Sequence, residues 1–171
     1  MTRSILADAF DHHVWASLLL LDALDGLSEE QLATTVPGTY GSILDTARHL
    51  VGSDRWYLFN LSRHGVDQID EDSMSVAELR VAMEADGPSW RSILATDPDP
   101  DEDFVVTRED GSESHATWGV RLAQVVHHGT DHRSQIATAL TSLGLTPPEM
   151  DVWDWALTVR KHGITGEPVA G

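Results

Sequence analysis

Apolar side chains recur every three or four positions along most of the chain, which is the spacing of an amphipathic α-helix. The first helix is expected to carry this repeat at Leu6, Phe10, His13, Ser17, Leu20, Leu24 and Leu27. Three further long helices are expected over about residues 42–63, 75–95 and 118–143. Helices of this kind bury their apolar faces against one another, so the pattern predicts an all-α fold, most simply an antiparallel four-helix bundle.

Residues that favour helix ends support these boundaries. Ser42 and Ser75 stand where an N-cap is needed, and Glu78 completes a capping box with Ser75. Gly144 follows the last long helix at a position typical of a C-terminal cap.

Shorter elements are expected outside the four helices. The pair Asp110 and Gly111 lies between two short β-prone runs and predicts a small hairpin before the last long helix. Pro147 and Pro148 precede a short extra C-terminal helix. Residues 1–160 are therefore expected to form a single domain, and residues 161–171 a frayed C-terminal tail.

The charge balance argues against several partners. The 171 residues include 28 Asp and Glu against 11 Lys and Arg, a net charge of -17. Nucleic-acid binding and attachment to an anionic membrane both need clustered cations, so we expect neither. The absence of cysteine excludes disulfides, a cysteine nucleophile and cysteine-ligated metals. No signal-peptide pattern and no membrane-spanning apolar run is evident, so we expect a cytoplasmic protein.

Three of the nine histidines fall within the stretch VVHHGTDHRSQI, residues 125–136. On a helical wheel His132 lies on the apolar stripe, His128 lies at its edge one turn earlier, and His127 points away. Side chains four residues apart lie on the same face, so His128 and His132 can converge on one metal ion. Such a pair also arises by chance. Gly129 stands where a zinc peptidase of the H-E-x-x-H type has its glutamate, so that function is excluded.

A third ligand would have to come from elsewhere, and His49 is the candidate. It lies off the apolar stripe of its helix, on a second face with Asp45, Ser53, Trp56 and Asn60. That face is either a solvated surface or the wall of a pocket, and the helical wheel does not decide between them. His13, on the core stripe of the first helix, is interpreted as a hydrogen-bonded core or pocket-rim histidine.

Three stretches together resemble the DinB/YfiT-like superfamily of metal-binding four-helix bundles. They are FDHHVWASLLLLDAL near the start, GSILDTARHLVGSDRWYL in the second helix, and HHGTDHRSQI followed by LGLTPPEMDVWDWAL near the end. The resemblance spans about residues 10–157, although residues 64–117 match only in length and general character. Arg133 and Gln135 match a polar pair of the superfamily, with no chemical role that the sequence reveals.

The resemblance implies an up-down-down-up bundle and a divalent metal ion, zinc or nickel, held by His49, His128 and His132. His127 stands where the superfamily often has asparagine, and the four-residue spacing to His132 favours His128 as the ligand. Some relatives resemble transferases or isomerases that use a low-molecular-weight thiol such as mycothiol or bacillithiol. The resemblance also implies a homodimer.

Three neutral histidines leave a bound ion with an open position, as in catalytic sites. The first hypothesis is therefore a metal-dependent transferase that uses a thiol cofactor to attack a small electrophilic substrate. The alternatives are a stress-related module that binds a metal or small molecule without turnover, and a metal-dependent hydrolase. Asp45 and Asp131 are candidates for orienting the imidazoles, or they lie on a solvated face. No residue is assigned a catalytic role beyond the ligands.

Overall fold

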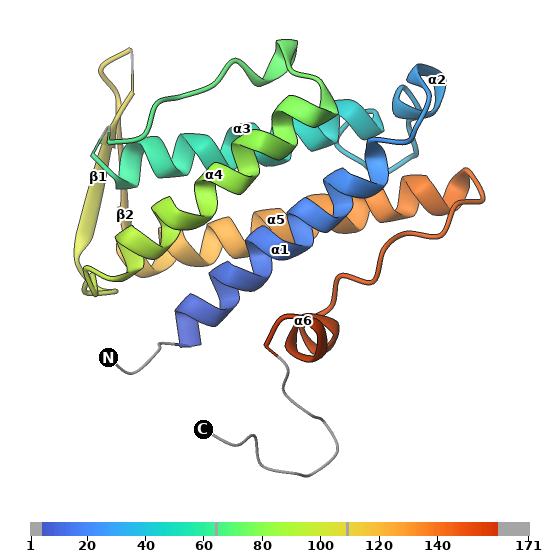
Figure 1. The fold of residues 1–171 in the computed structure, drawn as a ribbon. Helices are drawn as coiled ribbons and strands as arrows, with labels where there is room; N and C mark the ends of the chain where they lie inside the picture. Colours follow the sequence, from blue (N-terminus) through green and yellow to red (C-terminus); the bar gives the residue numbers. More distant parts are fainter. Residues whose placement is uncertain (1–4, 64, 109, 161–171) are drawn as a thin grey trace.

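The computed structural model describes residues 5–63, 65–108 and 110–160, so the expected tail at 161–171 lies outside the described residues. The described chain is mostly helical and carries one small sheet (Figure 1). The elements in chain order are α1 (Ile5–Leu24), α2 (Glu29–Leu32), α3 (Ile43–Leu61), the 3-10 turn η1 (Glu71–Ser73), α4 (Val76–Leu94), β1 (Asp103–Thr107), β2 (Glu113–Thr117), α5 (Trp118–Ser142) and α6 (Val152–Thr158).

The four long helices pack side by side around one apolar core. In Figure 1, α1 and α5 run in one direction, while α3 and α4 run in the other. α1 and α3 each pack against both α4 and α5. The core they enclose includes side chains that are at most 2% exposed, among them Phe10, Leu20, Leu50, Met83 and Ile136.

The connection between α3 and α4 follows from these directions. Because the two helices run the same way, residues 62–75 must return along the length of α3 before α4 begins (Figure 1). The turn η1 lies in this connection and contacts α3. Glu71 and Asp72 of this turn are thereby brought against a helix of the bundle.

Helix ends fall where the capping residues predict them. The Ser42 and Ser75 hydroxyls accept hydrogen bonds from the backbone N–H groups of Asp45 and Glu78, and both acids complete capping boxes. Gly144, just beyond α5, has a φ of 75°, which glycine adopts without steric strain. The boundaries of the long helices were therefore predictable from local sequence.

The expected hairpin is present, so the fold is mostly helical but not purely so. β1 and β2 pair antiparallel, with Val105 opposite His115. Phe104 and Val106 on β1 are buried against the bundle core. Arg121 of α5 donates two hydrogen bonds to the Phe104 carbonyl, at 3.0 and 2.7 Å, and so ties the hairpin to the last long helix.

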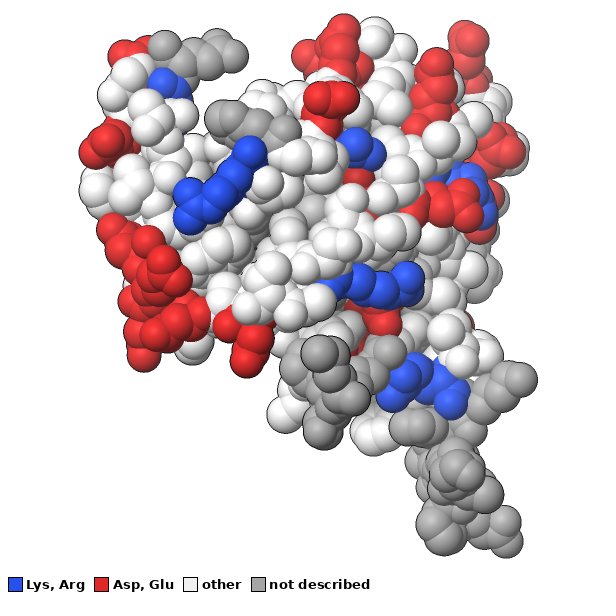
Figure 2. Space-filling model, turned by 60° about the vertical axis from the view of Figure 1, so that its left-hand side comes forward, with Lys and Arg blue, Asp and Glu red and all other residues white. Residues whose placement is uncertain are grey.

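The surface reflects the acidic composition. Figure 2 shows acidic side chains gathered along the edges of one face, with basic side chains between them. Among the described residues, none of the helices has the length and hydropathy needed to cross a lipid bilayer.

Candidate metal centre

The packing of α3 on α5 brings His49, His128 and His132 together. The Nε2 atom of His128 lies 3.2 Å from Nε2 of His49 and 3.0 Å from Nε2 of His132. One ligand atom from each of the three lies within 4.8 Å of the others. Three nitrogens bound tetrahedrally to one ion at ~2.0–2.1 Å would be roughly 3.3 Å apart. The cluster therefore fits a three-histidine metal site.

Local helix geometry explains where each histidine lies. His128 and His132 occupy successive turns of α5, with His132 buried and His128 half-buried, whereas His127 is exposed on another face. His49 is half-buried because α5 and the turn at residues 36–42 cover its face of α3. Of the two interpretations of that face, the pocket wall is the one that the structure supports.

The surroundings favour the unprotonated form of His49 and His128. Burial, together with smaller effects of the nearby His132 and His49, lowers the pKa of His128 to about 4. Burial also lowers the pKa of His49, and His132 adds to that effect. Because a histidine must be neutral to bind a metal, both side chains are ready as ligands at neutral pH.

Gln135 determines which nitrogen of His132 faces the cluster. Its Oε1 accepts a hydrogen bond from the His132 Nδ1 at 3.4 Å and another from the Tyr40 backbone N–H at 2.7 Å. An amide oxygen only accepts, so the His132 proton lies on Nδ1 and the Nε2 lone pair faces the cluster. Gln135 also donates to Asp131 at 2.9 Å, so Asp131 acts on His132 only through Gln135.

Asp45, the other expected orienting carboxylate, has a different role. Its Oδ2 accepts from the Ser42 hydroxyl at 2.7 Å and from the Ser42 backbone N–H at 3.3 Å. These are capping interactions at the start of α3. Asp45 contributes to the surroundings of His49 only as one wall of the neighbouring cavity.

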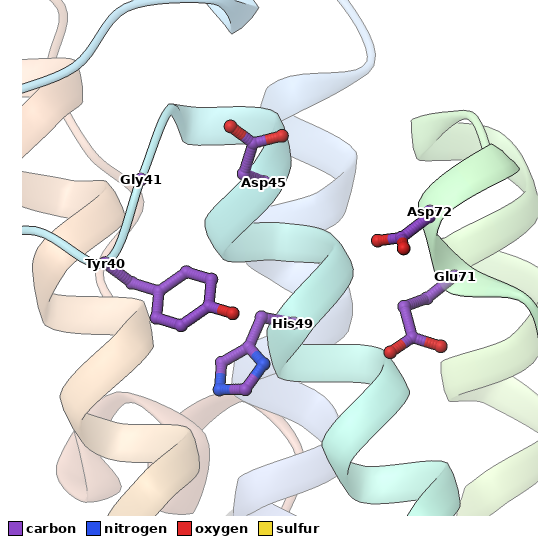
Figure 3. Close-up of a pocket in the computed structure, with 6 residues that line it drawn as sticks. All are labelled: Tyr40, Gly41, Asp45, His49, Glu71 and Asp72. Atoms are coloured by element: carbon purple, nitrogen blue, oxygen red, sulfur yellow. The ribbon is translucent and has the colours of Figure 1, made fainter.

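Tyr40 covers the outer face of His49. The two rings are stacked, with centroids 4.0 Å apart and planes 5° from parallel. Beside them lies a cavity of about 370 Å³ lined by Tyr40, Gly41, Asp45, His49, Glu71 and Asp72 (Figure 3). Tyr40 comes from an irregular turn, where apolar periodicity carries no information, so its place beside His49 was not predictable from the sequence.

The family model of the DinB family matches residues 1–162. The chain belongs to the DinB family. A comparison with curated proteins found no match. Family membership and a three-histidine cluster with the spacing of a metal site thus come from independent observations.

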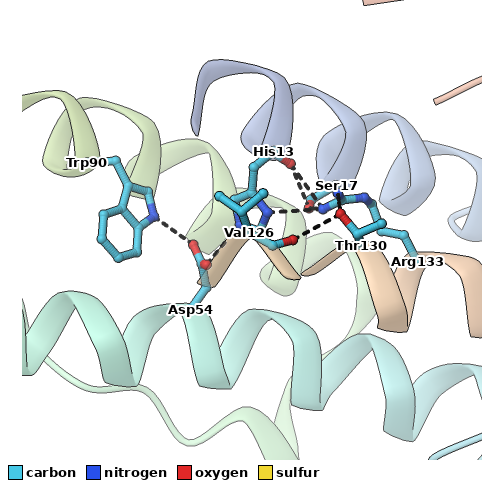
Figure 4. A network of polar contacts seen from close by, with 7 residues as sticks. All are labelled: His13, Ser17, Asp54, Trp90, Val126, Thr130 and Arg133. Carbon is cyan, nitrogen blue, oxygen red and sulfur yellow. Dashed lines mark hydrogen bonds and ion pairs between the residues drawn. The ribbon is translucent and has the colours of Figure 1, made fainter. Parts of the chain in front are cut away.

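A second polar cluster in this DinB-family chain lies in the bundle core (Figure 4). The carboxylate of Asp54 accepts from Nε2 of His13 and from Nε1 of Trp90, both at 2.9 Å. Arg133 donates to Nδ1 of His13 at 3.1 Å and to the Ser17 hydroxyl at 3.0 Å. A guanidinium has no acceptor, so His13 carries its proton on Nε2. His13 is the hydrogen-bonded core histidine that its position predicts, with 0% exposure.

The roles of Asp54 and Arg133 in this network were not predicted from the sequence. Asp54 is only 3% exposed and lies four residues beyond Leu50 and four before Leu58, on the apolar stripe of α3. An acid on a core stripe is the signal that could have found it. Arg133 is 4% exposed, and its burial depends on the approach of α1, which no local pattern of α5 predicts.

Gly129 allows this approach. A Cβ atom at residue 129 would lie 2.3 Å from Cε1 of His13 and 2.5 Å from its Nδ1. Only a residue without a side chain lets the His13 ring pack against α5 between His128 and Arg133. The glycine that excludes an H-E-x-x-H peptidase thus has a packing role.

The remaining described histidines lie outside both clusters. His12 is within 2.9 Å of the Met150 carbonyl and thereby holds the segment that precedes α6. His115 is exposed on β2 beside Asp103 and Glu113, which raise its pKa. His64 and His162 lie outside the described residues.

Proposed function

We propose that this DinB-family protein binds one divalent metal ion, zinc or nickel, through His49, His128 and His132. The proposal extends to an enzyme that activates a low-molecular-weight thiol, such as mycothiol or bacillithiol, for attack on a small electrophile. The convergence of three Nε2 atoms carries the proposal. Three neutral ligands leave the ion with its full charge and an open position, which favours an anionic fourth ligand such as a thiolate.

When bound, the ion would lower the pKa of a thiol so that its sulfur is nucleophilic at neutral pH. The sulfur would then form a bond to an electrophilic carbon of the substrate, whose leaving group would depart with the electron pair of the broken bond, while the thiol proton would pass to solvent. The chain has no cysteine, so no thiol of its own competes for the site. Gln135 holds His132 in the required tautomer, and Tyr40 shields one face of His49 from water.

The metal site is tested by elemental analysis of protein purified without a histidine tag and reconstituted with zinc or nickel. We expect one ion per chain in the parent, none in His49→Ala or His128→Ala, and one in His127→Ala. His127 is the matched control because it is the exposed neighbour of His128. An ion retained in His49→Ala, or absent from the reconstituted parent, would contradict the site.

The reaction class is tested with the metal-loaded protein and an aryl halide, with and without added thiol. Thioether formation that requires both metal and thiol supports the transferase. Hydrolysis without thiol would indicate the hydrolase, and tight metal binding with neither reaction would indicate a binding module. The homodimer is a separate prediction that sedimentation equilibrium tests.

A further inference from the structure

His49 differs from His132 in how its second ring nitrogen is held. The Nδ1 of His132 donates a hydrogen bond to Gln135. The Nε2 of His49 faces His128 at 3.2 Å, and its Nδ1 has no hydrogen-bond partner among the described residues. A neutral imidazole that binds a metal through Nε2 carries its proton on Nδ1. Metal-binding histidines almost always donate that proton to a carboxylate, a carbonyl or water, so His49 needs such a partner.

Glu71 lies on the same face of α3 as His49. A Cβ atom at Gly52 would lie 2.3 Å from Cδ of Glu71 and 2.4 Å from its Oε1, so the carboxylate packs directly against the bare helix. Gly52 follows His49 by three residues, and residues at that spacing share one face of a helix. Glu71 and His49 also line the same cavity (Figure 3). A side chain at position 52 would therefore displace the Glu71 carboxylate from the face that carries His49.

Glu71 is the acid of this cavity best suited to act on His49. It is half-buried, and in the part of the chain that the structure describes its carboxylate has no hydrogen bond and no ion pair. Asp45 is already engaged in the cap of α3, and Asp72 is exposed. Burial and the nearby His132 lower the pKa of His49, and the charge of Glu71 partly opposes them. A negative charge that favours an added proton on the ring also favours a metal ion bound to it.

We propose that Glu71 is a positioning residue of the candidate metal centre: its carboxylate accepts a hydrogen bond from the Nδ1–H of His49 and so orients Nε2 toward the ion. This role rests on the proposed function and adds the partner that His49 lacks. The hydrogen bond makes the imidazole a stronger donor to the metal. Glu71 then does for His49 what Gln135 does for His132.

The zinc affinity of the reconstituted protein, measured by competition with a chromophoric chelator, tests this role. Glu71→Gln keeps the length of the side chain and removes its charge, so we expect it to bind zinc at least about tenfold more weakly than the parent. The matched control is Asp72→Asn, which removes an equal charge from the adjacent residue. It should weaken binding by less than about threefold, because the exposed Asp72 carboxylate is screened by salt.

Gly52→Ala is an independent variant, because its Cβ displaces the carboxylate of Glu71 without removing it from the chain. It should weaken zinc binding as Glu71→Gln does. Combining the two substitutions should cause no further loss, since both remove the same interaction.

A spectroscopic signal separates orientation of the ring from a general effect of charge. In zinc-loaded protein with isotope-labelled histidine, the hydrogen-bonded Nδ1 proton of His49 should give a downfield NMR signal. Glu71→Gln should shift this signal or remove it by exchange with water, and Asp72→Asn should retain it.

Parent-like zinc affinity or an unchanged Nδ1 signal in Glu71→Gln would overturn the role of Glu71 and leave the metal site intact. Equal losses of affinity in Glu71→Gln and Asp72→Asn would do the same, because the effect would then depend on charge alone. If the reconstituted parent binds no zinc, the metal site and the role of Glu71 both fail.

Discussion

The two histidine clusters of this protein lie between α5 and other helices but differ in their hydrogen bonding. In the core network, His13 has a donor on one side, Arg133, and an acceptor on the other, Asp54. In the candidate metal centre, His128 Nε2 faces two other ring nitrogens and carries at most one proton to share with them. A histidine between complementary partners has both of its ring nitrogens hydrogen-bonded within the protein. Histidines that face one another present ring-nitrogen lone pairs that a single metal ion can bind together.

The largest effect is expected from Asp54→Ala in the core network. It leaves the His13 Nε2–H and the Trp90 N–H without their acceptor and removes the carboxylate whose charge favours the buried Arg133 cation, so unfolding free energy should fall by about 3–5 kcal/mol. Urea unfolding of metal-free protein measures this loss. His49→Ala should change the same quantity by less than about 1 kcal/mol, because the metal-free cluster contributes little to folding. Equal losses in the two variants would remove the distinction between the clusters.

A smaller loss of stability is expected from Gly129→Ala. The new methyl group would overlap the His13 ring, and overpacking of a core costs about 1–3 kcal/mol. Gly26→Ala is the matched control, because no atom lies within 4 Å of the added Cβ. The urea midpoints of both variants give the comparison. If Gly129→Ala were as stable as Gly26→Ala, the packing role of this glycine would be refuted.

Gln135→Ala should affect metal affinity more than stability. Loss of the hydrogen bond to His132 frees the ring to rotate and to change tautomer, which lowers metal affinity about 10–100-fold. Competition with a chromophoric chelator measures the affinity. Gln124→Ala, at an exposed position of the same helix, should bind the metal as the parent does. An unaltered affinity in Gln135→Ala would show that packing alone orients His132.

The last prediction concerns the pH dependence of the metal-free protein. The pKa of His128 is about 4 in the folded chain and 6.5 ordinarily, so the unfolded chain takes up the proton first as the pH falls. The contribution of His128 to stability is therefore complete above pH 6.5 and is lost as the pH falls toward 4. His128→Gln should flatten the fall in urea midpoint between these two values. Parallel curves for the parent and the variant would argue against a buried, neutral His128.

Local sequence determined the helices, their caps and the pairing of His128 with His132. These features follow from the 3.6-residue period and from hydrogen bonds within a few residues, which sequence spacing reports directly. The burial of His13 was also predictable, since it lies on the apolar stripe of its own helix. His49 was added as a ligand by resemblance to a family, because its helical wheel left two interpretations open.

Only the tertiary structure decided what surrounds those histidines. Tyr40 and Gln135 meet across 95 residues of sequence, and His13 and Arg133 across 120. Glu71 reaches the candidate metal centre because two parallel helices force their connection back along α3, where Gly52 leaves room for it. Such contacts depend on how whole helices pack. The apolar repeat of one helix does not identify which residues of the other helices will lie against it. The sequence by itself therefore determined the candidate ligands, whereas the packing decided their tautomers, their burial and the charge of the cavity beside them.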